Sequence, residues 1–260
     1  MSRLVFGVQP VREVLRAHGN RVETLWLAGA PPGQAGELRD GENPKLAGLH
    51  RLAESCGVVV TPTSRHELER MSKGGMHQGA AALAPDLKLI DHEHFMKLVT
   101  NLEAPPTVVI LDGIMDPQNF GAVVRSAVAL GAPFVVWPEH GSAPLTPATF
   151  RASAGAVEHA TLVRVPSLPP LIHDLKQVGF TVVLLEGGSD TALESVQLSG
   201  PVAIVVGAED RGAKPAVKKA TSVRAHVPMT RAIDSLNASV ACALALYEVG
   251  RQRRASNEIP

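Results

Sequence analysis

The 260-residue sequence has only two cysteines, Cys56 and Cys242, and no Cys-x-x-Cys pair. A disulfide framework or a cysteine-based zinc site is therefore not indicated, and a reducing compartment is expected. No stretch approaches the ~18 uninterrupted apolar residues of a membrane-spanning helix. The N-terminus also lacks the apolar segment of a secretory signal. We expect a cytoplasmic protein that neither enters nor crosses a membrane.

The sequence also has no net charge and few aromatic residues. The 25 Lys and Arg residues balance 25 Asp and Glu residues, and aromatic residues make up 3% of the chain, so Ala, Val and Leu must fill the interior. A neutral balance argues weakly against a nucleic-acid binder, but it can hide local basic patches. With 45% hydrophobic and 19% charged residues, the composition is that of a globular protein of one large or two modest domains.

Helix and strand signals alternate in the first third of the chain. Helices are predicted over residues 11–17 and 45–55, and a third begins where Ser64 and Glu67 fit a capping box. Strands are predicted over 23–27 and 58–61, and an apolar run covers 80–84. Residues 31–43 are rich in glycine, proline and charge, which indicates a loop. Together these signals predict a compact α/β unit that ends near residue 84.

Residues 85–106 lack strand character and are bracketed by prolines, so we interpret them as a linker with one helix over 94–102. The run Asp91-His-Glu-His94 allows a metal-site interpretation. An acidic helix start near the positive end of the helix dipole explains the same residues, and we prefer it because a metal site needs ligands held in a rigid shell.

Short β-branched runs dominate the rest of the chain, at residues 107–112, 134–137, 181–185 and 202–206. Helical stretches separate them, which predicts a parallel sheet covered on both faces. Such sheets bind ligands at the carboxyl ends of their strands, so the loops after the strands are where functional residues are expected. The tail after Arg254 is expected to fray.

The first such loop, 112–121, follows strand 107–112 and contains Asn119 and Gly121. Asn119 can donate and accept hydrogen bonds, and Gly121 permits a close backbone approach. We expect Arg125 one turn inside the following helix, able to reach back toward the loop. A plain strand–turn–helix connection with an arginine on a solvated face explains the loop equally well.

The second loop, 206–212, places Gly207, Glu209 and Gly212 after strand 202–206. It is not the Gly-x-Gly-x-x-Gly fingerprint, which argues against an ordinary dinucleotide site. A basic cluster follows, which would either position nucleic-acid phosphates or form a solvated helix face. The cluster comprises Arg211, Lys214, Lys218 and Lys219.

The third loop, 227–239, leads into a helix that is expected to run to about Arg253, with Asp234 or Ser235 as its cap. Asn237 and Ser239 add short polar groups to the expected first turn, where they compete with the helix backbone unless they cap it or contact something else.

In this order the three loops resemble the SpoU (TrmH) branch of the SPOUT RNA methyltransferases. Asn119, Gly121 and Arg125 match the family's Asn-x-Gly-x-x-x-Arg, and the second loop matches Gly-x-Glu-x-x-Gly. Pro228-Met229 and residues 235–241 match its third motif. The sequence departs from the pattern at Arg231, where many relatives have glycine.

The resemblance extends to the N-terminal unit. Residues 5–15 and the turn His77-Gln78-Gly79 look like parts of the family's RNA-binding domain. The implied fold is an α/β, trefoil-knotted parallel-sheet methyltransferase domain preceded by a small L30e-like αβα domain. The implied organisation is a substrate-binding domain (1–84), a linker (85–106), a methyltransferase domain (107–254) and a tail (255–260).

The resemblance also implies S-adenosylmethionine as cofactor and the ribose 2′-hydroxyl of a large-subunit (23S) ribosomal RNA guanosine as substrate. Other RNA targets, such as a transfer RNA or another ribosomal nucleotide, and a non-catalytic ribosome-assembly role are the alternatives. A homodimer through the methyltransferase domain is implied, with no DNA or membrane partner. The implied catalytic residues are Arg125, Asn119, Glu209, Ser235 and Asn237, and the implied cofactor-binding residues are Gly207, Val227 and Leu236. Because a guanidinium stays protonated, we expect Arg125 to act electrostatically on the hydroxyl and its neighbouring phosphate.

Overall fold

The computed structural model describes residues 2–29, 43–143, 145–230 and 235–256. These residues form two compact units. Unit 1 comprises the chain up to Leu87 together with the separate segment Ala154–His159, and unit 2 comprises Lys88–Ser153 and the chain from Ala160 onward. No helix in the described parts is long and apolar enough to cross a membrane.

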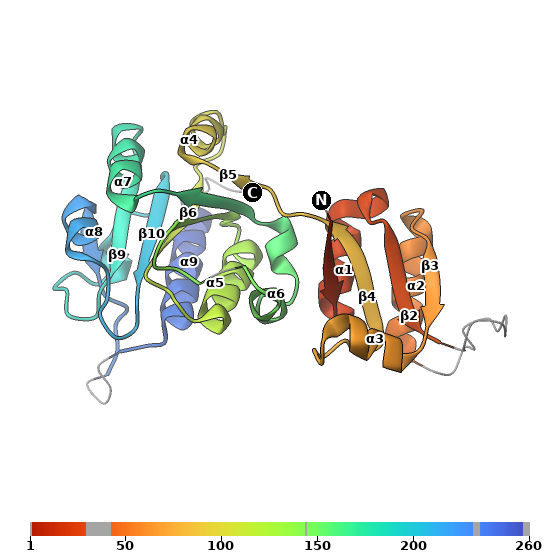
Figure 1. Ribbon diagram of the computed structural model, residues 1–260. Coiled ribbons are helices and arrows are strands. Elements are labelled where there is room, and N and C mark those ends of the chain that lie inside the picture. The colour runs from red at the N-terminus through yellow and green to blue at the C-terminus, as the bar shows by residue number, and fades with distance from the viewer. Residues whose placement is uncertain (1, 30–42, 144, 231–234, 257–260) are drawn as a thin grey trace. The chain divides into compact units, whose positions relative to one another are not determined.

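Unit 1 is a four-stranded mixed sheet with helices packed against it (Figure 1). The strand order is β1-β4-β2-β3, in which β4 is antiparallel to both of its neighbours and β2 is parallel to β3. Its main elements are β1 (Ser2–Phe6), α1 (Val8–His18), β2 (Thr24–Ala28), α2 (Pro44–Ser55), β3 (Val60–Thr63), α3 (Arg65–Ser72) and β4 (Ala80–Pro85). The sequence did not predict β1. Of the predicted loop 31–43, only Asn43 is described, and it caps α2.

The core of unit 1 lies between α1, α2 and the sheet. Val11, Val14 and Leu15 of α1 are fully buried, as is Leu49 of α2. They pack against alternate residues of β4, of which Ala82 is also fully buried. The spacing of three to four along α1 and of two along β4 follows from the helical and strand periodicities.

The turn before β4 is held by side chains. Gln78 has a φ of 51°, a left-handed conformation that non-glycine residues rarely adopt. Its Oε1 accepts a hydrogen bond from the Val8 backbone N–H at the start of α1, at 3.2 Å. His77 Nδ1 accepts one from the Gly79 N–H at 3.1 Å. The turn that the family resemblance singled out therefore links α1 to β4.

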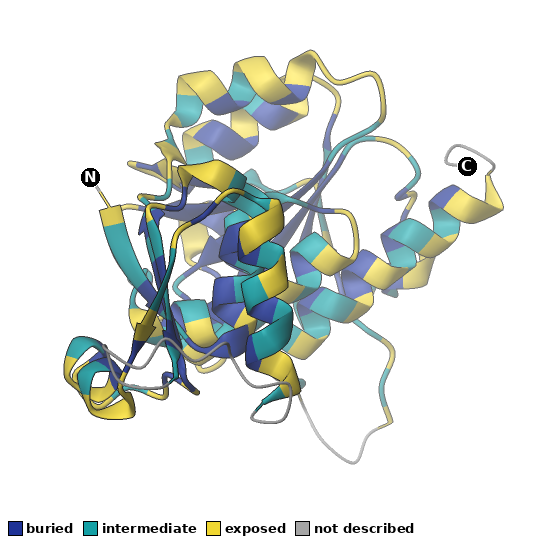
Figure 2. Ribbon diagram, turned by 90° about the vertical axis from the view of Figure 1, so that its right-hand side faces the viewer, coloured by how far each residue is buried: buried dark blue, intermediate teal, exposed yellow. Residues whose placement is uncertain are grey.

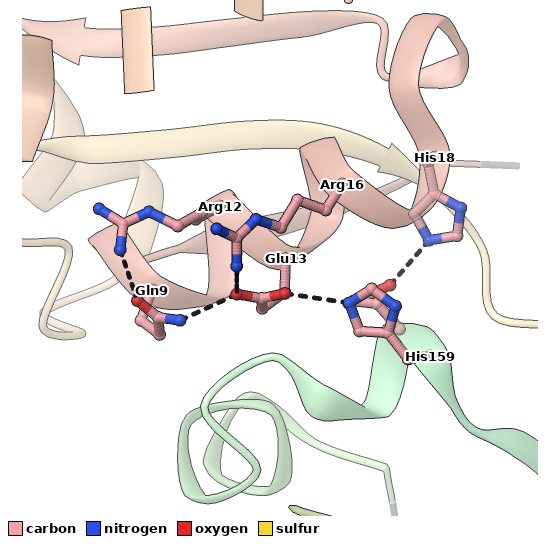
Figure 3. Close-up of polar contacts among 7 residues, drawn as sticks. Gln9, Arg12, Glu13, Arg16, His18 and His159 are labelled. Carbon is pink, nitrogen blue, oxygen red and sulfur yellow. Dashed lines mark hydrogen bonds and ion pairs between the residues drawn. The ribbon is translucent and has the colours of Figure 1, made fainter. Parts of the chain in front are cut away.

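Segment Ala154–His159 packs against α1 and ends in the 3₁₀ turn Ala156–His159 (Figure 3). The Glu158 carboxylate is almost completely buried and accepts hydrogen bonds from Arg3 and from His18 Nε2, the latter at 2.8 Å. His159 Nε2 contacts Glu13 Oε2 at 3.0 Å. A Cβ on Gly155 would lie 2.8 Å from the Glu13 Cβ, so the segment fits closely against the helix.

Unit 2 is a seven-stranded parallel sheet of order β11-β9-β10-β6-β7-β8-β5. Its strands are β5 (Leu89–Ile90), β6 (Thr107–Asp112), β7 (Phe134–Pro138), β8 (Thr161–Val165), β9 (Thr181–Leu185), β10 (Val202–Gly207) and β11 (Val223–Ala225). Its helices are α4 (His92–Thr100), α5 (Pro117–Ala129), α6 (Pro147–Ala152), α7 (Leu168–Gln177), α8 (Pro215–Ala220) and α9 (Ala238–Ala255).

The segment before β6 differs from its prediction. It contains the edge strand β5, although we expected no strand there, and α4 begins two residues before the predicted 94. Phe95 of α4 is fully buried in the core of unit 2. Asp91 caps α4, because its Oδ1 accepts a hydrogen bond from the His94 backbone N–H at 2.9 Å, which supports the helix-start interpretation of the acidic and histidine run.

Helices cover both faces of the sheet. On one face α4, α7 and α8 pack against alternate strand residues, including Val108 and Ile110 of β6. On the other face α5 and α9 contact each other, and α9 contacts β10. Figure 2 shows the resulting buried strands between helices with exposed outer sides. The parallel, doubly covered sheet predicted from the apolar runs is therefore confirmed.

Gly121 is needed for helix packing. A Cβ at this position would lie 2.5 Å from the Ala152 Cβ and 2.7 Å from the Thr149 carbonyl oxygen, both in α6. The close backbone approach expected at Gly121 is thus made by a neighbouring helix.

Candidate functional site

Three polar side chains meet where the predicted loops converge. Asn237 Nδ2 donates to Asn119 Oδ1 at 2.9 Å and to Glu209 Oε1 at 2.6 Å. Asn119 lies in the first turn of α5 after β6, Glu209 follows β10, and Asn237 precedes α9. Because β6 and β10 are parallel neighbours, their carboxyl ends bring the first two loops together. We call these three residues the amide–carboxylate triad.

Asn237 also begins α9. Its Oδ1 accepts from the Ser239 backbone N–H at 2.9 Å and from the Val240 N–H at 3.4 Å. The predicted cap at Ser235 is therefore wrong, and the other predicted cap, Asp234, lies outside the described residues together with Arg231. With its Oδ1 capping the helix and its Nδ2 bonded twice, Asn237 fixes the positions of both other members of the triad.

Gly207 permits a tight turn after β10. A Cβ there would lie 2.3 Å from the Ala213 backbone nitrogen, because the chain folds back on itself. The Ala208 and Gly212 backbones pair across this turn, with N···O distances of 3.2 and 2.8 Å. The second motif therefore needs glycine for its own backbone geometry, and this geometry places Glu209 at the tip of the turn.

Asp112, at the carboxyl end of β6, holds the far end of the same turn. Its side chain is 1% exposed, and its Oδ2 accepts from the Lys214 backbone N–H at 2.7 Å. The Lys214 ammonium lies 3.6 Å from its other oxygen. A buried carboxylate thus ties the loop of Glu209 to the neighbouring strand.

Replacing Asp112 with alanine should lower the free energy of unfolding by about 1–3 kcal/mol, because the Lys214 backbone N–H loses its charged acceptor in a part-buried hydrogen bond. Asp112→Asn keeps an acceptor oxygen and should cost less. Urea denaturation followed by circular dichroism measures both variants. Equal losses in the two variants would contradict a role for the hydrogen bond.

A pocket opens beside the triad, at the carboxyl ends of β9 and β10. Its cavity volume is about 170 Å³. All three predicted cofactor-binding residues, Gly207, Val227 and Leu236, line it, and so do Glu209 and Ser235. Most of the remaining lining is apolar or glycine. The sequence-predicted cofactor residues therefore share one cavity with part of the predicted catalytic set.

Arg125 does not join the triad. It lies more than two turns inside α5, not one turn as expected, and points roughly 120° away from Asn119 around the helix. Its side chain is exposed and makes no hydrogen bond or ion pair with any residue that the structure describes. The guanidinium is therefore available to an external ligand.

The predicted basic cluster is largely neutralised. Arg211 pairs with Asp210 at 3.1 Å, Lys214 with Asp112, and Lys218 with Glu186. These acidic partners reduce the positive field that the sequence indicated, and they favour structural roles for Lys214 and Lys218.

Two polar pocket residues, Glu186 and His226, were missed by the sequence analysis. Glu186 directly follows β9 and His226 follows β11, so the strand-end rule applied to the other loops would have found them. The Glu186 carboxylate accepts from Lys218 and lies 3.5 Å from Arg224 Nη1. The hydrogen bond from Lys218 is the main cause of a pKa of Glu186 below its ordinary value.

The lowered pKa of Glu186 predicts a pH-dependent contribution to stability. A carboxyl whose pKa is depressed by folding stabilises the native state above its unfolded pKa, here about 4.5, and loses that contribution as pH falls through the folded value. The difference in unfolding free energy between wild type and Glu186→Gln should be constant near neutral pH and shrink below pH ~4.5. Urea titrations from pH 7 to 3 measure it; a difference that grows on acidification would reverse the sign.

Comparisons with known proteins identify the family of this chain. The model of the SpoU rRNA Methylase family matches residues 106–247, and that of the RNA 2′-O ribose methyltransferase substrate-binding domain matches residues 4–89. The 23S rRNA (guanosine-2′-O-)-methyltransferase RlmB of Pseudomonas syringae pv. tomato is 34% identical over 99% of this chain and 100% of its own.

Solved structures show the same fold. The SpoU methyltransferase AviRb from Streptomyces viridochromogenes, crystallised with AdoMet, superposes with a TM-score of 0.75 at 22% identity, over 98% of this chain and 91% of its own. A protein studied for 2-OH methylation of C/U34 on tRNA has a TM-score of 0.52 at 27% identity, over 58% of this chain and 99% of its own. The matches to both family models and to a full-length relative show that this chain belongs to the SpoU rRNA methylase family.

Proposed function

We propose that the protein transfers a methyl group from S-adenosylmethionine to the ribose 2′-hydroxyl of a guanosine in 23S ribosomal RNA. The observation that carries this proposal is the pocket bordered by the amide–carboxylate triad, which the three predicted cofactor-binding residues line together with the predicted catalytic residues Glu209 and Ser235. The relative named for this reaction matches the chain from end to end.

The pocket suits the cofactor chemically. Apolar side chains such as Val227 and Leu236 can pack against an adenine ring, and the Gly207 backbone lies open beside them. The buried Nδ1 of His226 has no hydrogen-bond partner among the described residues, as expected of a group that meets a ligand. When bound, S-adenosylmethionine supplies an electrophilic methyl group on its sulfonium.

The chain's own residues would prepare the hydroxyl. Exposed Arg125 would bind the phosphate beside the target ribose and lower the pKa of the 2′-hydroxyl, which then loses its proton to solvent. Since Asn119 Oδ1 accepts from Asn237, its Nδ2 is left to donate to the ribose or the phosphate. Glu209 fixes Asn237, and Ser235 borders the pocket. Such positioning can supply several kcal/mol of the barrier.

Ribosomal RNA is favoured over transfer RNA by the extent of the matches. The match to the protein studied for tRNA methylation covers 99% of that protein but only 58% of this chain. The match to the 23S rRNA enzyme covers 99% of this chain. The substrate-binding family model covers residues 4–89, which make up most of unit 1. We propose that this part binds ribosomal RNA, in the cytoplasm.

The test is to incubate the purified protein and S-adenosylmethionine with ribosomal RNA and transfer RNA from a strain that lacks the gene, and to map 2′-O-methyl nucleotides by mass spectrometry. One new 2′-O-methylguanosine in 23S RNA is expected. Methylation of transfer RNA, or of another nucleotide, would replace the substrate assignment. Cofactor binding without any methylation would favour an assembly factor.

We also propose a homodimer through α9. Val240, Leu244 and Tyr247 are 46%, 42% and 56% exposed and follow one another at spacings of four and three, so they form an apolar stripe on one side of the helix. A second copy of the chain would cover this stripe. Light scattering should give twice the monomer mass for wild type and the monomer mass for Leu244→Glu with Tyr247→Glu. Val178→Glu, at an exposed position on another helix end, is the control.

The family resemblance further supports a trefoil knot in unit 2. Tracing the chain in an experimental structure tests it, and an unknotted path would reject it.

A further inference from the structure

The pocket has a second polar end away from the triad. The strands that border it lie in the order β6-β10-β9-β11, and each is followed by a polar residue: Asn119 after β6, Glu209 after β10, Glu186 after β9 and His226 after β11. Adjacent strands are about 4.8 Å apart, so Glu186 and His226 lie one and two strands beyond Glu209. Asn119 and Glu209 belong to the triad; the other two residues take no part in preparing the hydroxyl.

Glu186 is a fixed acceptor. Its backbone N–H donates to the Ala225 carbonyl at 2.9 Å, and Lys218 and Arg224 hold its carboxylate from two sides. A carboxylate offers about four acceptor positions, so two cations leave room for a ligand. Because an ionised carboxylate can only accept, the group that meets it in the pocket must be a hydrogen-bond donor.

The His226 backbone is held by two hydrogen bonds, whereas its ring Nδ1 has no hydrogen-bond partner among the described residues. Its N–H donates to the Thr191 carbonyl and its carbonyl accepts from the Leu193 N–H, at 2.9 and 2.8 Å. The ring Nδ1 is buried and has no hydrogen-bond partner among the residues the structure describes. An unpaired buried polar atom is unfavourable, so a ligand group that hydrogen-bonds to it gains affinity.

Resting on the proposed function, we infer that Glu186 and His226 recognise the adenosine of the cofactor, with Glu186 accepting hydrogen bonds from its ribose hydroxyls. The methyl group must face the triad, which leaves another part of the cofactor for the β9–β11 end. The apolar walls there suit a nucleoside. Acidic residues after a parallel strand bind ribose hydroxyls in dinucleotide-binding folds by the same chemistry.

The experiment is calorimetry with S-adenosylhomocysteine and with its 2′-deoxy, 3′-deoxy and 6-oxo (inosyl) analogues. Glu186→Gln and Glu186→Ala should each weaken S-adenosylhomocysteine binding by roughly tenfold or more, the range for a hydrogen bond to a charged group. Against the deoxy analogue that lacks the bonded hydroxyl, the same variants should lose less than about threefold, since the interaction is already missing. His226→Phe should weaken binding of the natural ligand and fill the ring's space.

The matched control is Glu194→Gln, an exposed acid of the same unit away from the pocket, which should bind all four ligands as wild type does. Thermal unfolding of each variant without ligand checks its fold. If the Glu186 variants lose the same affinity for every ligand, Glu186 only supports the pocket wall. If they lose no affinity, Glu186 faces solvent. Either result overturns the inference. A loss that disappears only with the 6-oxo analogue would overturn the ribose assignment. If wild type binds none of the ligands, the proposed function itself fails.

Discussion

Replacing Arg125 with alanine should reduce methylation of ribosomal RNA by about 10²–10³-fold and leave cofactor binding unchanged. The side chain is exposed and has no partner in the described structure, so its loss removes no folding interaction. What it removes is the positive charge that we propose acts on the hydroxyl as the hydroxyl becomes an alkoxide. Single-turnover rates at saturating RNA and calorimetry with S-adenosylhomocysteine measure the two effects separately.

Arg125→Lys separates the electrostatic role from a base role. A lysine keeps the charge but not the planar guanidinium, so it should recover part of the rate without a new dependence on pH. Arg164→Ala, which removes another exposed arginine of unit 2, is the matched control and should keep wild-type activity. A lysine variant whose rate rises with pH through the lysine pKa would support a base at this position instead.

Replacing Glu158 with alanine should destabilise unit 1 by about 1–3 kcal/mol, because Arg3 and His18 each lose a hydrogen bond to a buried carboxylate. Its side chain is 1% exposed, and those of Arg3 and His18 are 15% and 12% exposed. The chain has two tryptophans, Trp26 in β2 of unit 1 and Trp137 in β7 of unit 2. In a Trp137→Phe background, Trp26 fluorescence therefore reports the urea unfolding of unit 1.

The control for Glu158 is Glu103→Ala, an exposed acid without an ion-pair partner among the described residues, which should unfold as the background does. A combined Arg3→Leu and Glu158→Leu variant should recover part of the loss, since it removes both charges together. If Glu158→Ala unfolds at the control's urea concentration, the buried contact contributes no net stability.

The parts of the fold that the sequence predicted well are those in which pattern and burial coincide. The runs 107–112, 181–185 and 202–206 are almost wholly buried strands, and nearly continuous apolar sequence is what that environment requires. Strand β8 was missed although Thr161–Val165 is also β-branched; its exposed Arg164 breaks the run. Strand β5 is too short to have a period.

The sequence predicted contacts between residues of the three motifs. It did not predict contacts between residues that lie outside the motifs and far apart in the sequence. The triad members are all motif residues, and the predicted cofactor residues do line the pocket. Sequence spacing could not show that Lys218 of the basic cluster pairs with Glu186. The pair joins a helix to the end of a strand that lies 32 positions earlier in the chain. The meeting of Glu158 with Arg3, across 155 positions, is likewise invisible in any local pattern.

Segment Ala154–His159 completes unit 1 but is synthesised long after the rest of that unit. Chains emerge from the ribosome N-terminal end first, and domains usually fold as they appear. Unit 1 cannot complete its fold on that schedule, because the residues that bury Glu13 and His18 are made only after β7 and α6. Until residue 159 leaves the exit tunnel, one side of α1 stays open to water, and a recombinant fragment that ends at residue 87 would keep it open permanently.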